Sequence, residues 1–199
     1  LCGFIKSDNY LETPNLQFHV SPMSTDVLGN TTLHKFPAFT PTICNVKPTS
    51  RGSVELDGND TRNDPKICLN YLSTPEDRDI AGKAIKITRK IVMESKAFKP
   101  YAPSELRPGI DITDNEQLAT EAGKFANTVF HPVSTCRMGN DGESVVSDRL
   151  LAHGLKGLRI VDASVMPSIT FGNTNAPTIM IAEKGADFIL EDQKNMPAT

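Results

Sequence analysis

Three segments in the last third of the chain gather residue types that can do chemistry. They are His131–Gly139 (HPVSTCRMG), Gly157–Pro167 (GLRIVDASVMP) and Gly172–Thr178 (GNTNAPT). Of the four histidines, only His131 lies in one of them, and imidazole is the side chain that most readily exchanges a proton near neutral pH. Residue type alone makes His131 no more than a candidate for a general base. The alternative for an isolated histidine between a helix and a strand is a structural role.

Composition indicates a globular chain without metal or nucleic-acid chemistry. With 199 residues, 38% of them hydrophobic, the chain can bury a core. The four cysteines form no CxxC pair, so we expect reduced thiols rather than a zinc site or a disulfide framework. A net charge of −3 offers no basic surface for nucleic acid, and no run approaches the roughly 18 apolar residues of a transmembrane helix. Asn30 and Asn59 begin Asn-X-Thr triplets, which leave the cellular compartment open.

The first seventy or so residues have the pattern of an antiparallel sheet. Apolar and polar residues alternate over residues 16–21, the period of a half-buried strand. Val54 and Leu56 repeat the alternation after a turn signal, and residues 67–71 form another short apolar run. Prolines recur throughout this segment and leave little room for a long helix.

Helical signals begin at Thr74, a capping hydroxyl followed by Pro75 at the first helical position. This helix should end near Pro100. A second helix is predicted from a capping box, Thr113 with Glu116. The expected apolar stripes are Ile80, Ala84, Ile87 and Ile91 in the first helix, and Leu118, Ala122, Phe125 and Val129 in the second.

Two further predicted elements position the second and third of these segments. Residues 158–161 form a short apolar run that we interpret as a buried strand. Residues 176–191 are predicted to be helical, with Pro177 in the first turn. The apolar face expected for that helix comprises Ile179, Ala182, Ala186 and Ile189.

In order and spacing, the three segments resemble the C-terminal part of the glucose-methanol-choline (GMC) family of FAD-dependent oxidoreductases, especially its choline dehydrogenase and alcohol dehydrogenase branch. The likeness continues weakly upstream through Ser50–Leu56 and Asn70–Leu72. Ser134 departs from the family pattern, which usually has glycine there, and Ser147 replaces a common aspartate. A side chain at a glycine position restricts the backbone.

The resemblance implies an α+β fold in two parts. Residues 1–145 are expected to form a substrate-binding domain, an antiparallel sheet with flanking helices. Residues 146–199 are expected to supply the C-terminal strand and helix of a Rossmann-like FAD domain. None of the 13 glycines forms a GxGxxG motif after a strand, so we expect the N-terminal FAD-binding half to be missing from this chain. The chain alone should then be inactive.

The resemblance also implies roles for individual residues. His131 matches the family's catalytic histidine, and Asn173 matches its second active-site position. An amide can donate a hydrogen bond to the substrate oxygen but cannot take a proton at neutral pH, so His131 would be the only base. Asn173 could instead be a loop residue chosen for turn geometry.

Six residues are implied in cofactor binding. Asp162 and Ala163 would contact the diphosphate and ribityl region of FAD, although Asp162 could equally mark a strand end. The positive end of the last helix would favour the negative charge of reduced flavin. By resemblance, Asn175, Ala176, Pro177 and Thr178 lie along that edge of the flavin and the ribityl chain.

The function implied for the whole protein is oxidation of a primary alcohol, a small-molecule partner, to an aldehyde with FAD as hydride acceptor. The sequence has no Trp and three Tyr, little for an aromatic cage around choline. One alternative is a hydroxynitrile lyase on the same fold, with flavin as a bystander. Another is a binding module without catalysis.

Overall fold

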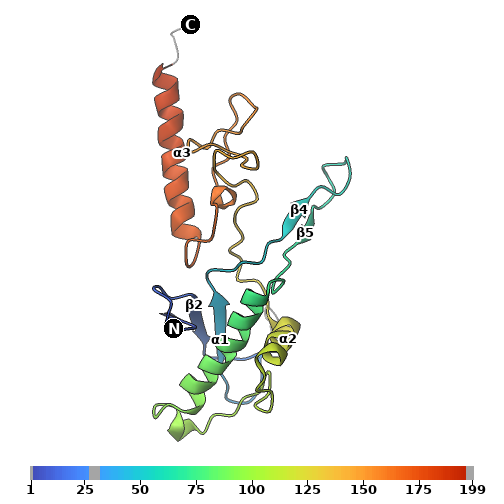
Figure 1. Cartoon of the computed structure of the whole chain (residues 1–199), viewed down its shortest axis with the longest axis vertical. Coiled ribbons are helices and arrows are strands. Elements are labelled where there is room, and N and C mark those ends of the chain that lie inside the picture. Colours follow the sequence, from blue (N-terminus) through green and yellow to red (C-terminus); the bar gives the residue numbers. More distant parts are fainter. Residues whose placement is uncertain (1, 27–31, 196–199) are drawn as a thin grey trace. The chain divides into compact units, whose positions relative to one another are not determined.

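The computed structural model describes residues 2–26 and 32–195, so the triplet at Asn30 lies outside the described residues. The chain divides into two compact units, residues 1–129 and 130–199. The described parts contain three α-helices and two antiparallel sheets, which confirms the α+β class (Figure 1). No helix in those parts has the length and apolar character needed to cross a bilayer.

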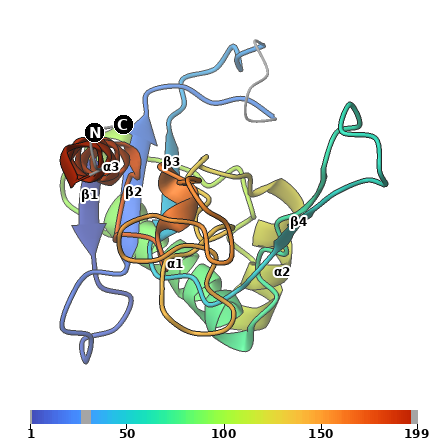
Figure 2. The ribbon, with the colours of Figure 1, turned by 90° about the horizontal axis from the view of Figure 1, so that it is seen from above.

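The first unit is built on a three-stranded antiparallel sheet of order β1–β2–β3 (Figure 2). The strands are β1 (Cys2–Ile5), β2 (Leu16–Ser21) and β3 (Thr40–Asn45). The predicted strand over residues 16–21 is therefore confirmed, and it is the central one. Leu16 at its start is fully buried.

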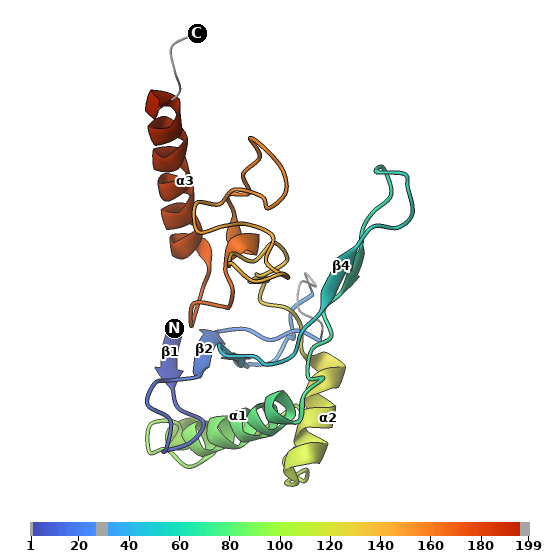
Figure 3. The same cartoon turned by 45° about the horizontal axis from the view of Figure 1, so that its top comes forward.

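Helix α1 (Pro75–Met93) packs against this sheet, as Figure 3 shows. The side chain of Thr74 accepts the N–H of Asp77, which confirms the predicted cap. Ile80 and Ala84 form a buried cluster with Leu16. The helix ends at Met93, before the expected end, and a short 3-10 turn η1 (Lys99–Tyr101) follows.

Helix α2 (Asn115–Phe125) packs on α1 where Gly82 has no side chain. The predicted cap was wrong by one residue, because the side chain of Asp114, and not that of Thr113, accepts the N–H of Gln117. Both residue types can cap, so the sequence alone could not separate them. The helix also stops before Val129, which is partly exposed.

A second, two-stranded sheet pairs β4 (Ser53–Glu55) with β5 (Lys66–Cys68). Strands lie at both predicted places, but β5 ends at Cys68 rather than near residue 71, and all residues of the two strands are exposed. A Cβ on Gly52 would lie 2.1 Å from the carbonyl oxygen of Cys68, so the approach of the two segments requires glycine there.

The second unit encloses its own core, formed by Val146, Leu150, Val165, Met166 and Ile181. Residues 130–145 belong to it, because the N–H groups of Cys136 and Met138 donate to the carbonyls of Ser164 and Val165 at 3.0 and 2.8 Å. The compact unit thus begins at Phe130, upstream of residue 146. The functional division into residues 1–145 and 146–199 stays a prediction.

The strand expected at residues 158–161 is not present. This run makes one isolated antiparallel bridge, between Leu151 and Arg159, and Leu158 is 47% exposed. Ile160 N–H donates to the carbonyl of Leu150 at 3.1 Å, so the backbone is held by a loop rather than by a neighbouring strand. The short 3-10 turn η2 (Ala163–Val165) follows directly.

Helix α3 (Asn175–Asn195) was predicted correctly, but its buried face was not. Ile181 and Gly185 are buried, whereas Ile179 and Ile189 are 54% and 42% exposed. A Cβ on Gly185 would lie 2.6 Å from Cγ1 of Val161, so the glycine permits the close contact that selects this face. The helix carries apolar residues on more than one face, and periodicity could not choose between them.

Candidate active site

The second unit brings His131 and Asn173 together, although they are 42 residues apart in sequence. Nδ2 of Asn173 lies 2.7 Å from Nε2 of His131, within hydrogen-bond distance. His131 follows the end of the first unit, and Asn173 lies in the loop that leads into α3. The half-buried imidazole therefore presents one ring nitrogen to an amide that is exposed to solvent.

The other ring nitrogen of His131 faces Thr174. Oγ1 of Thr174 lies 3.0 Å from Nδ1, and the backbone N–H of Thr174 points at the same atom at 3.4 Å. Thr174 itself is 7% exposed. Both nitrogens of the ring thus have a polar neighbour, which fixes the plane of the imidazole.

Unusual backbone conformations surround this pair. Phe130, Ser134 and Phe171 have positive φ angles of 61°, 76° and 60°. Side chains other than glycine seldom adopt this region, and such strain gathers at functional sites. Phe130 immediately precedes His131, and Phe171 lies two residues before Asn173, so the strained positions flank both halves of the pair.

The first turn of α3 has the properties expected of a site for negative charge. Asn175 and Ala176 are exposed, and the first N–H groups of a helix have no partner within it. Pro177 has no N–H, and the N–H of Thr178 donates to the carbonyl of Thr174 at 3.0 Å. Two backbone donors, those of Asn175 and Ala176, are therefore the ones this turn can offer to an anionic flavin edge, and the residues fit such a group.

Asp162 and Ala163 lie on the segment that packs against α3. Asp162 is exposed, and its Oδ1 accepts the N–H of Ser164 at 2.7 Å, which caps η2. A carboxylate accepts hydrogen bonds from hydroxyl groups but repels phosphate. Asp162 therefore suits the ribityl hydroxyls of FAD better than its diphosphate, and Ala163 is tied into the core beside it.

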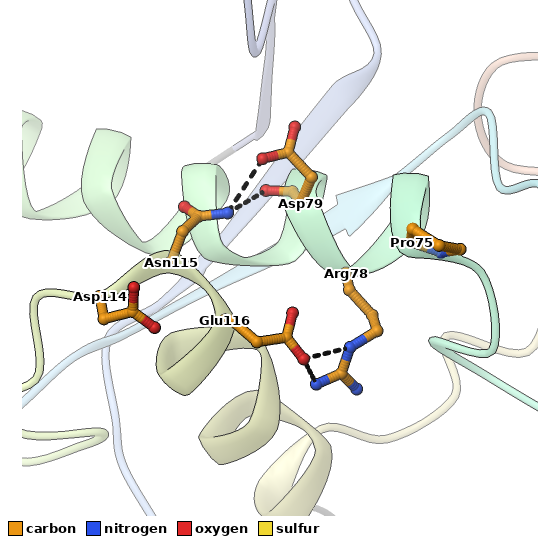
Figure 4. A pocket seen from close by; sticks show the side chains of 6 residues that line it. All are labelled: Pro75, Arg78, Asp79, Asp114, Asn115 and Glu116. Atoms are coloured by element: carbon orange, nitrogen blue, oxygen red, sulfur yellow. Dashed lines mark hydrogen bonds and ion pairs between the residues drawn. The ribbon is translucent and has the colours of Figure 1, made fainter.

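A shallow pocket in the first unit carries no comparable chemistry (Figure 4). Arg78 pairs with Glu116, and Nδ2 of Asn115 donates to Oδ1 of Asp79 at 3.0 Å. Asp114 is occupied in capping α2. The polar groups that line the pocket thus satisfy one another at the junction of two helices. In residues 2–26 and 32–195, no cluster of His, Cys, Asp or Glu is placed to hold a metal ion.

Comparison with known proteins decides the family. The family model described as GMC oxidoreductase matches residues 48–182, which include His131, Asp162 and Asn173. The chain belongs to the GMC oxidoreductase family. The resemblance inferred from the three sequence segments is thereby confirmed.

Individual relatives support the assignment to the GMC oxidoreductase family. The chain is 42% identical over 189 residues to an oxygen-dependent choline dehydrogenase of Pseudomonas fluorescens, covering 94% of this chain and 33% of that protein. It is 41% identical over 188 residues to an alcohol dehydrogenase [acceptor] of Pseudomonas putida, covering 94% of this chain and 34% of the relative. The chain therefore spans about a third of the length of the curated relatives it matches.

A solved GMC structure agrees with the fold and supports the cofactor. The formate oxidase of Aspergillus oryzae, a protein whose FAD is modified, superposes with a TM-score of 0.84 at 25% identity, covering 93% of this chain and 33% of the oxidase. Family membership and this FAD-containing neighbour support the prediction of FAD. The oxidoreductase class follows from the same findings.

Thr174 is the site residue that sequence reasoning missed. It lies between Asn173 and Asn175, both of which were singled out, yet a threonine before a helix is ordinarily a cap. One signal was available: Pro177 occupies the third helical position and cannot donate to a capping hydroxyl.

Proposed function

We propose that this chain supplies the catalytic pair of a flavoprotein that oxidises a primary alcohol to an aldehyde. The observation that carries the proposal is the 2.7 Å contact between Nε2 of His131 and Nδ2 of Asn173. This contact places a proton acceptor next to a hydrogen-bond donor. During oxidation the alcohol oxygen gives up a proton and gains negative charge, so both groups would act on it.

In this proposal the substrate hydroxyl enters between the two side chains and replaces their mutual contact. Nε2 of His131 takes the hydroxyl proton, and Nδ2 of Asn173 donates to the oxygen as negative charge develops on it. FAD, when bound, supplies the acceptor for the hydride that leaves the alcohol carbon. The N–H groups of Asn175 and Ala176 would stabilise negative charge at the flavin edge.

Asp162, Ala163, Asn175, Ala176, Pro177 and Thr178 are the residues of this chain that we assign to the cofactor. The first turn of α3 would lie along the isoalloxazine edge and the ribityl chain. Asp162 would accept from a ribityl hydroxyl. These residues reach only the flavin side of FAD, because the sequence has no glycine-rich loop for its ADP half.

We infer further that an N-terminal part, homologous to the other two thirds of the relatives, completes the cofactor site. The exposed second face of α3 supports this, since Ile179 and Met180 are 54% and 56% exposed and Leu190 is 55% exposed. Apolar residues gathered on one side of a helix mark a surface that another segment covers. Residues 1–145 would then shape the substrate side.

The test is anaerobic mixing of the FAD-loaded, full-length protein with a panel of primary alcohols and their secondary isomers. The panel includes choline because one relative is a choline dehydrogenase. Loss of the oxidised flavin absorbance with formation of aldehyde supports the proposal. Cleavage of a cyanohydrin without a change in flavin absorbance would indicate a lyase instead. Ligand binding by a protein that holds no flavin would indicate a binding module.

A further inference from the structure

Thr174 is placed to act on His131 although it does not face the open side of the site. The residue is 7% exposed and immediately precedes α3. Its carbonyl accepts the N–H of Thr178 at 3.0 Å, the first hydrogen bond of the helix. Its hydroxyl lies 3.0 Å from Nδ1 of His131. The backbone carbonyl of Thr174 thus bonds within the helix, while its side-chain hydroxyl contacts His131.

Pro177 removes one of the two usual partners of this hydroxyl. A threonine before a helix normally accepts the N–H of the second or third helical residue. The third residue of α3 is Pro177, which has no N–H. The capping bond to that position cannot form, so only the N–H of Ala176 could compete with His131 for the hydroxyl, which lies 3.0 Å from Nδ1.

The hydrogen bond to Thr174 bears on which ring nitrogen carries the proton. A neutral imidazole has one N–H, and a hydroxyl can accept it. With the proton on Nδ1 and donated to Oγ1 of Thr174, the lone pair of Nε2 faces Asn173. That tautomer alone can receive a substrate proton at Nε2. It also matches an amide N–H of Asn173 directed at Nε2.

The backbone N–H of Thr174 acts in the opposite sense, since it points toward Nδ1 and favours a lone pair there. Its distance of 3.4 Å exceeds the 2.7–3.2 Å of ordinary N–H hydrogen bonds, whereas the hydroxyl contact of 3.0 Å lies within range. The hydroxyl contact is therefore the stronger of the two, and a hydroxyl can rotate to accept.

We propose that Thr174 is a positioning residue that holds His131 in the Nδ1–H tautomer, with Nε2 open to the substrate. The proposal rests on the assignment of His131 as base. Which ring nitrogen of His131 carries the proton can be measured whether or not His131 is the base.

The experiment uses the FAD-loaded, full-length protein labelled with ¹⁵N-histidine. The His131 ring signals are identified by their loss in His131→Gln, and their shifts report which nitrogen is protonated. We expect a protonated Nδ1 in the parent protein and in Thr174→Ser. In Thr174→Val, which keeps the shape but removes the hydroxyl, the share of the Nε2–H tautomer should rise, because the backbone N–H of Thr174 still points at Nδ1 and the Asn173 amide can turn its oxygen toward Nε2.

Flavin reduction in the same variants provides the second readout. Thr174→Val should slow it roughly 10- to 100-fold, the size of effect known for the loss of a hydrogen-bond partner of a metal-bound histidine, and Thr174→Ser should restore most of the rate. A parent protein with its proton on Nε2 overturns the proposal without any variant. An unchanged tautomer in Thr174→Val overturns it as well. A shifted tautomer with no dependence of reduction on His131 would retain the positioning role and remove the proposed function.

Discussion

Ser134 donates a hydrogen bond of 2.8 Å from Oγ to the carbonyl oxygen of Met166 while its backbone holds a φ of 76°. A backbone in this region favours glycine, the residue that the resemblance noted in the sequence implies at this position. Serine accepts the conformational strain, and its hydroxyl ties the His131 segment to the core residue Met166. The hydrogen bond thus offsets part of the strain.

Substitutions at Ser134 should separate these two effects. Ser134→Ala keeps the strained backbone and loses the hydrogen bond, which should cost about 1 kcal/mol of unfolding free energy. Ser134→Gly loses the same bond but relieves about 1–2 kcal/mol of strain, so it should match or exceed the parent. Denaturant titration of the full-length variants gives the order, and a glycine variant no more stable than the alanine variant would contradict this interpretation.

Gly82 should be intolerant of even a methyl group. A Cβ there would lie 2.5 Å from the backbone oxygen of Asn115, which cannot move without displacing the start of α2. Gly82→Ala should therefore destabilise the protein by about 1–3 kcal/mol despite the better helix propensity of alanine. Gly123→Ala is the matched control, since its Cβ would meet only Leu72 at 3.9 Å, and it should stabilise by about 0.5–1 kcal/mol. Equal effects of the two substitutions on the denaturation midpoint would exclude the close contact.

Asp77 should contribute stability that depends on pH. Burial alone would raise the pKa of this carboxyl, but hydrogen bonds from Ser50 and Thr49 outweigh it and hold the pKa below its ordinary value. A carboxyl with a depressed folded-state pKa stabilises fully above its unfolded value of about 3.9, and the effect is lost as pH falls through the folded value.

Asp77→Asn should therefore cost about 1–3 kcal/mol at neutral pH, because it weakens charge-assisted hydrogen bonds in a residue that is 5% exposed. The difference from the parent should shrink as pH falls below about 4. Denaturant titrations between about pH 7 and pH 3.5 measure it. A gap that stays constant over this range would mean that the charge of Asp77 is not what stabilises the Thr49–Ser50 loop.

Replacing Asn173 by aspartate should slow flavin reduction more than replacing it by alanine. Asn173→Ala removes one donor and should slow flavin reduction by about 10²-fold. Asn173→Asp should be slower still, because it places a negative charge beside the developing alkoxide and replaces a donor by an acceptor. Stopped-flow absorbance under anaerobic conditions ranks the two, and faster reduction in the aspartate variant would remove Asn173 as a donor to the substrate oxygen.

Local signals predicted the elements of the fold well where one residue type had one physical role. Thr74 and Pro75 marked the start of α1, because a capping hydroxyl followed by proline suits few other structures. Alternation predicted the strand β2, but Gln17, which the alternation assigns to the polar face, is buried as well at 4% exposure. The start of α2 was missed by one residue, since Thr113 and Asp114 are both able to cap and only the backbone geometry decides.

Tertiary packing decided the features that the sequence could not. The face of α3 that packs within this chain differs from the predicted one, because the helix is apolar on two sides and the contact of Gly185 with Val161 selects one of them. The run at residues 158–161 lacks a neighbouring strand in the described residues and forms one bridge. The proximity of His131 and Asn173 could be inferred only from the family resemblance, because 42 residues separate them and no local pattern links the two segments.

The rate of flavin reduction in His131→Ala reports whether His131 takes the substrate proton. The full-length, FAD-loaded protein is mixed anaerobically with a primary alcohol, and His153→Ala serves as control, since that exposed histidine contacts the carbonyl of Gly139 rather than Asn173. We predict that His131→Ala retains its flavin but is reduced roughly 10²–10⁴-fold more slowly, the effect of losing one general base, while His153→Ala stays near the parent rate. Reduction of His131→Ala within a few-fold of the parent would mean that His131 is not the base.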